Sequence, residues 1–133
     1  MPRIETRTGV VVITPEGDIN HSEMVRVKNV ISESLRQGQT RFVLDLTEVD
    51  HINYMTLGVL VERAGRLHRS GGALFLAGLS GYLEKILRFT GVDELFQIFD
   101  TPELACVAHG AQRMQRSYDL VAGASGSWVP QMN

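Results

Sequence analysis

Beyond its first third, the chain alternates between apolar runs typical of buried strands and stretches with helical periodicity. Residues 42–46 read Phe-Val-Leu-Asp-Leu, and residues 73–77 form a second nearly continuous apolar run. Such runs suit strands that are covered on both faces of a sheet. Between them, Leu57, Leu60 and Leu67 recur at helical spacing. This alternation implies helices that cross over between largely parallel strands, and it predicts an α/β domain.

The first part of the chain predicts an antiparallel pair of strands followed by a helix. Residues 4–8 and 10–14 are short β-type runs that Gly9 separates, and residues 15–18 mark a bend or bulge. Ser22 is the expected N-cap of a helix that runs to about residue 37. One face of this helix carries Met24, Val27, Ile31 and Leu35.

The C-terminal part predicts a helix over 82–90, a short strand over 96–99 and a final helix capped by Asp100 or Thr101. The apolar face of that final helix is expected to comprise Leu104, Cys106, Val107, Ala108 and Ala111. Periodicity is lost from Ser117 onward. We therefore expect one domain over residues 1–116 and a flexible tail over 117–133, in which Trp128 is a loose aromatic or docks on a partner.

Composition excludes several classes of function. A net charge of −2 gives no broad basic surface for nucleic acid, and no apolar run approaches the roughly 20 residues that a membrane-spanning helix needs. The first residues lack the apolar core of a signal peptide, and the single Cys106 excludes an internal disulfide. Together these features predict a cytoplasmic protein.

Residues 49–60, Val-Asp-His-Ile-Asn-Tyr-Met-Thr-Leu-Gly-Val-Leu, follow an apolar strand and open an amphipathic helix. They resemble the signature loop of STAS domains, the family of bacterial anti-sigma factor antagonists. The resemblance covers roughly residues 4–112. It also rests on residues 17–22, 41–46, 71–74 and 83–99, which follow in the family's order.

The resemblance implies both a fold and a class of partner. The fold is a mixed four- to five-stranded sheet with helices packed mainly on one face. The function is non-enzymatic partner switching: the antagonist captures an anti-sigma factor of the serine-kinase type, the kinase phosphorylates it, and a phosphatase resets it. A phosphate adds about −1.5 to −2 charges, enough to disrupt a close-packed interface.

The chain departs from the family pattern in the loop itself. The phosphoacceptor position corresponds to Met55, which cannot accept phosphate, and Tyr54 occupies the other usual hydroxyl position. Asn53 and Asn20 stand where the family has aspartates. We interpret these changes as loss of the acidic surroundings of the phosphosite, and we expect binding that phosphate at position 55 does not control.

Two readings of the loop residues stay open. Thr56 is either a shifted phosphoacceptor or the N-cap of the following helix, and capping is favoured. Tyr54 and Met55 either anchor a partner or, for Met55, pack beneath the loop. Asn20 and Asn53 are expected to hold their loops through side-chain to backbone hydrogen bonds. The predicted partner-binding residues are Asn20, His21, Ser22, Asn53, Tyr54, Met55, Thr56, Leu57 and Gly58.

No catalytic, metal or cofactor site is predicted. The sequence has no nucleophile elbow or zinc-ligand spacing. The four histidines, His21, His51, His68 and His109, are expected to be ordinary exposed residues, although His21 and His51 could approach each other. Arg63, Arg66 and Arg69 are expected to form an exposed row that is either solvated or faces an acidic partner.

Two alternative functions remain. One is a scaffold subunit that forms a homodimer or a larger STAS assembly, or that sits on a membrane-transporter complex with an ABC ATPase. The other is a sensor that holds a small molecule or lipid between the loop and the edge strands.

Overall fold

The computed structural model describes residues 2–112. The predicted tail over residues 117–133, with Trp128, lies outside the described residues, as does the predicted domain boundary at residue 116. The whole segment that resembles the STAS pattern, residues 4–112, can therefore be compared with the structure.

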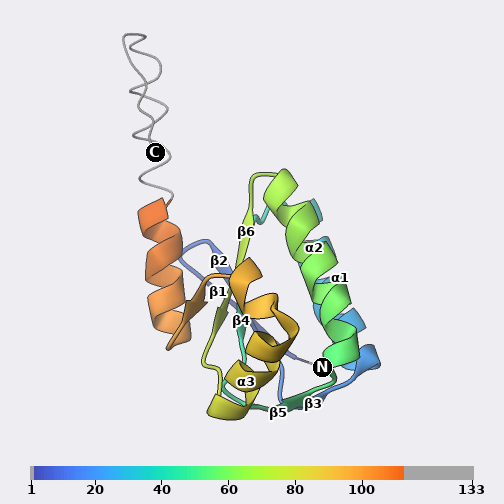
Figure 1. Cartoon of the computed structure of the whole chain (residues 1–133). Coiled ribbons are helices and arrows are strands. Elements are labelled where there is room, and N and C mark those ends of the chain that lie inside the picture. Colours follow the sequence, from blue (N-terminus) through green and yellow to red (C-terminus); the bar gives the residue numbers. More distant parts are fainter. Residues whose placement is uncertain (1, 113–133) are drawn as a thin grey trace, which may run out of the picture.

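A five-stranded mixed sheet forms the centre of the molecule (Figure 1). Its strands are β1 (Arg3–Arg7), β2 (Val10–Thr14), β4 (Arg41–Asp45), β6 (Ala73–Ala77) and β7 (Ile98–Phe99), in the order β1-β2-β4-β6-β7. The β1–β2 pair is antiparallel, and the other three pairs are parallel. The predicted opening hairpin and the central strand over 42–46 are thus confirmed.

A second, two-stranded sheet was not predicted. It pairs β3 (Gly17–Ile19) with β5 (Val49–Ile52) in parallel, with a register shift between Gly17 and Asp18. The predicted bulge near residues 15–18 is therefore confirmed, but it lies inside a short strand. This small sheet matters for function, because it brings the ends of β3 and β5 together.

Three helices cover one face of the large sheet: α1 (His21–Arg36), α2 (Leu57–Arg69) and α3 (Gly81–Thr90). Their buried residues include Met24, Val27 and Ile31 of the predicted stripe, which pack with side chains such as Phe42 and Leu44 of β4. Leu35 is only partly buried. Figure 1 shows α1 and α2 side by side on this face.

A C-terminal helix, over residues 102–112 of the described chain, lies on the opposite face of the sheet (Figure 1). Thr101 caps it, since its hydroxyl oxygen accepts the N–H of Leu104 at 3.1 Å. The predicted inward face is right for Cys106 and Ala108, which pack on the sheet. It is wrong for Leu104 and Val107, which are 52% and 69% exposed, and for Ala111, which is exposed. Ala105, which was not predicted, is fully buried beside Cys106 and Ala108. Small residues let the helix approach the sheet closely.

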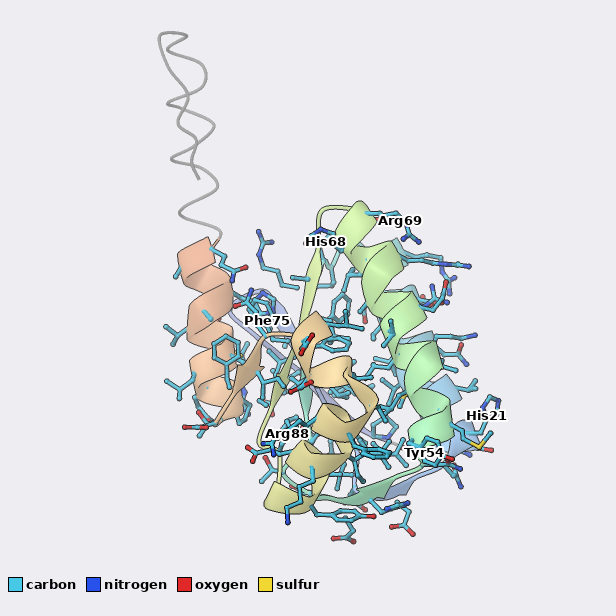
Figure 2. The ribbon with its side chains drawn as sticks, in the orientation of Figure 1. His21, Tyr54, His68, Arg69, Phe75 and Arg88 are labelled. Carbon is cyan, nitrogen blue, oxygen red and sulfur yellow. The ribbon has the colours of Figure 1, made fainter. Side chains whose placement is uncertain are left out.

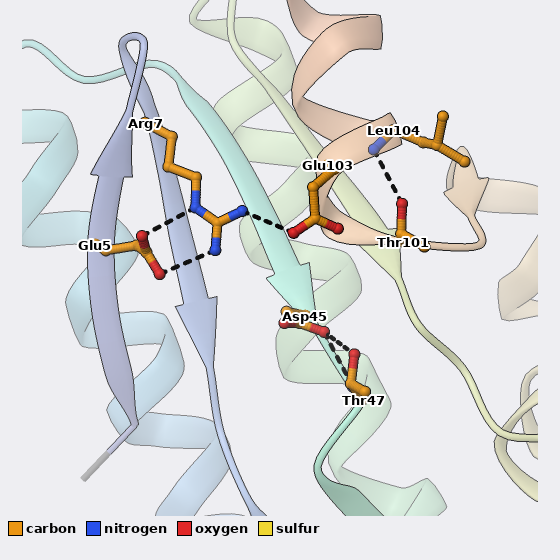
Figure 3. A network of polar contacts seen from close by, with 7 residues as sticks. All are labelled: Glu5, Arg7, Asp45, Thr47, Thr101, Glu103 and Leu104. Carbon is orange, nitrogen blue, oxygen red and sulfur yellow. Dashed lines mark hydrogen bonds and ion pairs between the residues drawn. The ribbon is translucent and has the colours of Figure 1, made fainter.

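An ion-pair network joins the first strand to this helix (Figure 3). The Arg7 guanidinium donates to both carboxylate oxygens of Glu5, at 2.9 and 3.0 Å, and to Glu103 at 3.1 Å. The bond from Arg7 lowers the pKa of Glu5, and a backbone N–H bond within Glu103, reinforced by Arg7, lowers the pKa of Glu103. Because both carboxylates are exposed, the network orients the helix more than it stabilises the fold.

Candidate functional site

The signature loop begins where β5 ends. Residues Tyr54–Thr56 form one 3-10 turn, η1, that leads directly into α2. Asn53 precedes this turn in an extended conformation, and its side-chain oxygen accepts the N–H of Met55 at 3.0 Å. Asn53 also accepts, through its main-chain carbonyl, the N–H of Thr56 at 2.9 Å. One amide side chain therefore fixes the shape of the loop.

The neighbouring loop before α1 is held by the same device. The side-chain oxygen of Asn20 accepts the N–H of Glu23 at 2.9 Å, which makes Asn20 the N-cap of α1. The prediction of Ser22 as the cap is wrong, because α1 begins one residue earlier, at His21. The Asn53 N–H donates to the Ile19 carbonyl at 3.0 Å, so the two loops lie side by side. The predicted bonds from Asn20 and Asn53 to the backbone are confirmed.

The predicted partner-binding residues divide by burial. Tyr54 and Met55 are 64% and 76% exposed, whereas Thr56 and Leu57 are each 3% exposed. The remaining five, Asn20, His21, Ser22, Asn53 and Gly58, are exposed. Met55 therefore does not pack beneath its own loop.

Thr56 precedes α2 but does not cap it through its side chain. Its backbone is already helical, with φ −88° and ψ −9°, and no side-chain capping bond forms. Instead its hydroxyl donates to the carbonyl of Asn53 at 2.8 Å. Thr56 thus stands at the N-cap position of α2, as predicted, but the predicted side-chain capping bond does not form; Asn53 caps the 3-10 turn that precedes α2. Burial and this bond turn the Thr56 hydroxyl toward the protein.

The sequence did not predict the part of the site that α3 contributes. The ring of His51, on β5, stacks on the ring of Tyr82, with centroids 5.6 Å apart, and a 2.7 Å hydrogen bond joins His51 Nδ1 to the Tyr82 hydroxyl. An apolar groove of about 410 Å³ runs beside this pair toward Phe89. Tyr82 is 51% exposed and Phe89 is 93% exposed. In the sequence, Tyr82 and Phe89 do not fall on the helical face that carries the buried Leu83 and Leu87, and this could have identified them as exposed aromatic residues.

His51, Tyr54, Tyr82 and Phe89 line this groove, and the exposed Met55 follows Tyr54 in the loop; we call these five residues the loop–α3 surface. Lys85 also lines its groove. Large exposed apolar side chains gathered in one place mark interaction sites on monomeric proteins. Tyrosine and methionine are among the residues enriched in such interfaces.

The other polar candidates lie elsewhere. His109 is buried, contrary to prediction: its ring stacks on Phe75, with centroids 3.9 Å apart, and its Nε2 lies 2.8 Å from the carbonyl oxygen of Phe42. Burial lowers its pKa. The predicted arginine row is broken at Arg63, whose side chain is only 14% exposed. Arg66 and Arg69 are exposed, and Arg66 pairs with Glu62.

The described residues offer no other chemical centre. Within residues 2–112 no group of three or more histidine, cysteine, aspartate or glutamate side chains is placed to hold a metal ion. Over the same residues, every helix is too short or too polar to cross a membrane. The site is therefore a surface of exposed side chains on a fixed backbone.

The family model of the STAS domain matches residues 1–105. The chain belongs to the STAS domain family. A provisionally named anti-sigma factor antagonist of Thermotoga maritima is 30% identical over 93 residues, which cover 69% of this chain and 82% of that protein. The family assignment confirms the resemblance seen in the loop and in the order of the other segments.

Solved structures agree with the fold. A provisionally named anti-sigma factor antagonist of Thermotoga maritima superposes with a TM-score of 0.73 at 25% identity, over 80% of this chain and 92% of that one. The phosphorylated form of SpoIIAA, a Bacillus cell-fate determinant, gives a TM-score of 0.64 at 22% identity, over 81% and 98%. The predicted mixed sheet with helices mainly on one face is confirmed. Named relatives of this kind make the chain a regulatory STAS protein.

Proposed function

We propose that this chain is an anti-sigma factor antagonist that captures an anti-sigma factor of the serine-kinase type through the loop–α3 surface. It acts in the cytoplasm by binding rather than by catalysis, and phosphate at position 55 does not control that binding. The observation that carries the proposal is Met55: it is 76% exposed at the tip of the signature loop, yet has no group that accepts phosphate.

The surroundings of Met55 support a binding surface without a phospho-switch. The hydroxyl of Thr56, the residue that follows Met55, is buried and donates to the Asn53 carbonyl. A kinase would have to break that bond and expose the side chain before transfer. A phosphate would be stabilised by free N–H groups at a helix start. Here the side-chain oxygens of Asn20 and Asn53 already accept such N–H groups, those of Glu23 and Met55.

The surface also has the features of a partner anchor. Tyr54 and Met55 stand out from a loop whose shape Asn53 fixes, so little conformational freedom is lost on binding. Tyr82 is held by its bond to His51, which orients a second aromatic ring beside them. Aromatic anchors of this kind dominate the energetics of many interfaces.

The experiment is a phosphorylation assay with the serine-kinase anti-sigma factors encoded by the host. Wild-type protein should bind one of them and take up no phosphate in residues 53–57, as read by intact mass and site mapping. The Met55→Ser variant restores an acceptor at the exposed position and should become phosphorylated by the same kinase. Phosphate on wild-type Tyr54 or Thr56, with loss of binding, would overturn the proposal.

Tyr54→Phe and Thr56→Val serve as matched controls in the same assay, because each removes a hydroxyl and keeps most of the side chain's shape. Neither substitution should alter the amount of kinase bound by more than about twofold, since neither hydroxyl is assigned a role in transfer. A chain that binds none of the kinases would contradict the partner class itself.

A further inference from the structure

The first strand, β1, forms an exposed edge of the large sheet. It pairs with β2 on one side only, and β7 lies at the opposite edge of the sheet. Residues 3–6 of this strand are exposed, and Ile4 is 47% exposed. Figure 3 shows β1 as the outermost strand, with Glu5 on it. An exposed edge strand is a template for pairing with another strand.

The turn after β1 determines which backbone groups the strand directs outward. The two turn residues, 8–9, have φ of 49° and 82°, as in the tight turns that join two strands of a hairpin. Such a turn is closed by a hydrogen-bonded pair, here Arg7 and Val10, and bonded pairs alternate along the ladder from there. Ile4 and Thr6 therefore direct their N–H and C=O groups outward. Within residues 2–112 no backbone hydrogen bond joins these outward groups to another element.

Ile4 also borders an apolar hollow of about 310 Å³ between β1 and α1. The side of the hollow on α1 is formed by Arg26, Asn29, Val30, Glu33 and Ser34. Because side chains alternate along a strand, the odd-numbered residues of β1 lie on the opposite face, where Arg7 bonds to Glu103. The edge therefore presents an apolar side chain on one face of the sheet and charged side chains on the other.

The charges of β1 alternate in sign, from Arg3 to Glu5 to Arg7. A second copy of β1 can pair antiparallel about a two-fold axis. Three registers, centred on residues 4, 5 and 6, overlap most of the strand and keep the outward backbone groups opposite one another. Centring on Glu5 sets like charges directly opposite, which is unfavourable. Centring on Thr6 relies on Arg7, whose guanidinium already donates to two carboxylates of its own chain.

We propose that two copies of this chain associate through β1, antiparallel, with Ile4 of both copies on the two-fold axis. The N–H of each Ile4 donates to the C=O of the partner's Ile4, and the two side chains pack together beside the hollows under α1. Each Arg3 lies opposite the partner's Glu5. The Arg3 side chain is 64% exposed, and its bonds to Glu48 use only the two terminal nitrogens, which leaves further N–H donors. The two five-stranded sheets become one continuous sheet.

This pairing is separate from the proposed function. It uses no residue of the loop–α3 surface, whose Tyr54 lies at the start of α2 (Figure 2). The dimer carries two such surfaces, one on each copy. The oligomeric state is measured without any anti-sigma factor, so its outcome does not bear on the partner class.

The test is sedimentation equilibrium of the full-length protein over a range of concentrations, in which the wild type should dimerise reversibly. Arg3→Glu and Glu5→Arg should each raise the Kd of the dimer at least about tenfold, because like charges then face each other at two places. An equimolar mixture of the two variants should return the Kd to within about threefold of the wild type, because every charge at positions 3 and 5 then faces its opposite.

Glu94→Arg is the matched control, since it makes the same charge change at an exposed position of η2 (Val92–Leu95) and should leave the Kd unchanged. All three variants replace exposed side chains, so each should keep a thermal midpoint close to that of the wild type.

Four outcomes would overturn the proposal. A wild-type protein that stays monomeric at every concentration would mean that β1 does not pair with a second copy. A dimer that both β1 variants retain would place the interface elsewhere. Weakening by Glu5→Arg but not by Arg3→Glu would put Thr6 on the axis. A mixture that does not regain affinity would mean that the two charges do not face each other across the interface.

Discussion

At two positions the immediate surroundings of one residue determine how a change there affects stability, and His109 is the first. Its ring is the polar group enclosed between the C-terminal helix and the sheet, stacked on Phe75 and bonded to the Phe42 carbonyl. Burial lowers its pKa below the ordinary value of 6.5, an effect the bond to Phe42 partly offsets and nearby Arg41 reinforces. The folded state therefore favours neutral histidine.

The sign of the pH effect follows from that preference. Above about pH 6.5 the His109 ring is neutral in folded and unfolded chains, so its contribution to stability is fully present. As the pH falls below 6.5, the unfolded chain binds a proton more readily, and stability is lost. We expect the urea midpoint to fall between pH 7.5 and pH 5 more steeply in the wild type than in His109→Gln. Equal slopes in the two proteins would contradict this.

Gly78 is the second such residue. Its φ of +73° lies in the region that favours glycine, and a Cβ there would overlap Thr47 Oγ1 and lie 3.1 Å from Asp45 Oδ1. Those two atoms are already engaged, because the hydroxyl and the N–H of Thr47 both donate to Asp45 (Figure 3). The turn after β6 thus has no room for a side chain.

We expect Gly78→Ala to lower the free energy of unfolding by about 2 kcal/mol, from strain and from the displaced Thr47. Chemical denaturation measures this directly. Gly65→Ala is the control, since Gly65 is inside α2 with only Arg69 within van der Waals distance. That substitution should be neutral or raise stability by up to about 1 kcal/mol. A neutral Gly78→Ala would mean that the turn can readjust.

At the scale of elements, the start of α1 is fixed by the side-chain amide of Asn20. Asn20→Ala should cost about 1 kcal/mol of unfolding free energy, because the N–H of Glu23 loses its acceptor. Asn20→Asp should retain most of the stability, since a carboxylate caps as well as an amide. Ser22→Ala should be close to neutral, because Ser22 is already inside α1. Thermal denaturation of the three variants separates these expectations, and a large loss in Ser22→Ala would contradict the cap assignment.

The sequence predicted those elements whose apolar residues follow a single clear period. The hairpin, the central strand and the buried stripes of α1 and α2 were found in this way. The inward face of the C-terminal helix was predicted only in part, because apolar residues occupy more than one of its faces. The choice of Ala105 and His109 over Leu104 and Val107 depends on how closely the helix approaches Phe75, which is a tertiary distance.

The candidate site could be predicted only where it coincides with the loop. Asn53, Tyr54 and Met55 follow from the resemblance, but the part of the site on α3 depends on tertiary contacts such as that of Tyr82 with His51. No local pattern encodes a contact between positions so far apart in the chain. Similarly, the 3-10 turn that buries Thr56 depends on geometry that the spacing of residues does not reveal.

At the scale of the whole molecule, exposed apolar side chains lie on both sides of the sheet, but we assign binding to one side. Phe89→Ser should weaken binding of the anti-sigma factor at least about tenfold and leave the thermal midpoint unchanged, because Phe89 is 93% exposed. Leu104→Ser, on the exposed face of the C-terminal helix, should change neither quantity. Calorimetric titration measures both affinities, and the opposite ranking of the two variants would move the interface to the other side.

The strand order also has a consequence for how the chain folds as it is synthesised. The hairpin of β1 and β2 closes within a few residues, but β2 must wait for β4, and β4 for β6, each time with a complete helix between them. Pairings that join distant segments form slowly. Until Ala77 has emerged from the ribosome, the nascent chain lacks β6, and its central strand β4 has only one neighbour, β2. We therefore expect the large sheet to form late in translation, and chains that stall before that point to expose apolar surface.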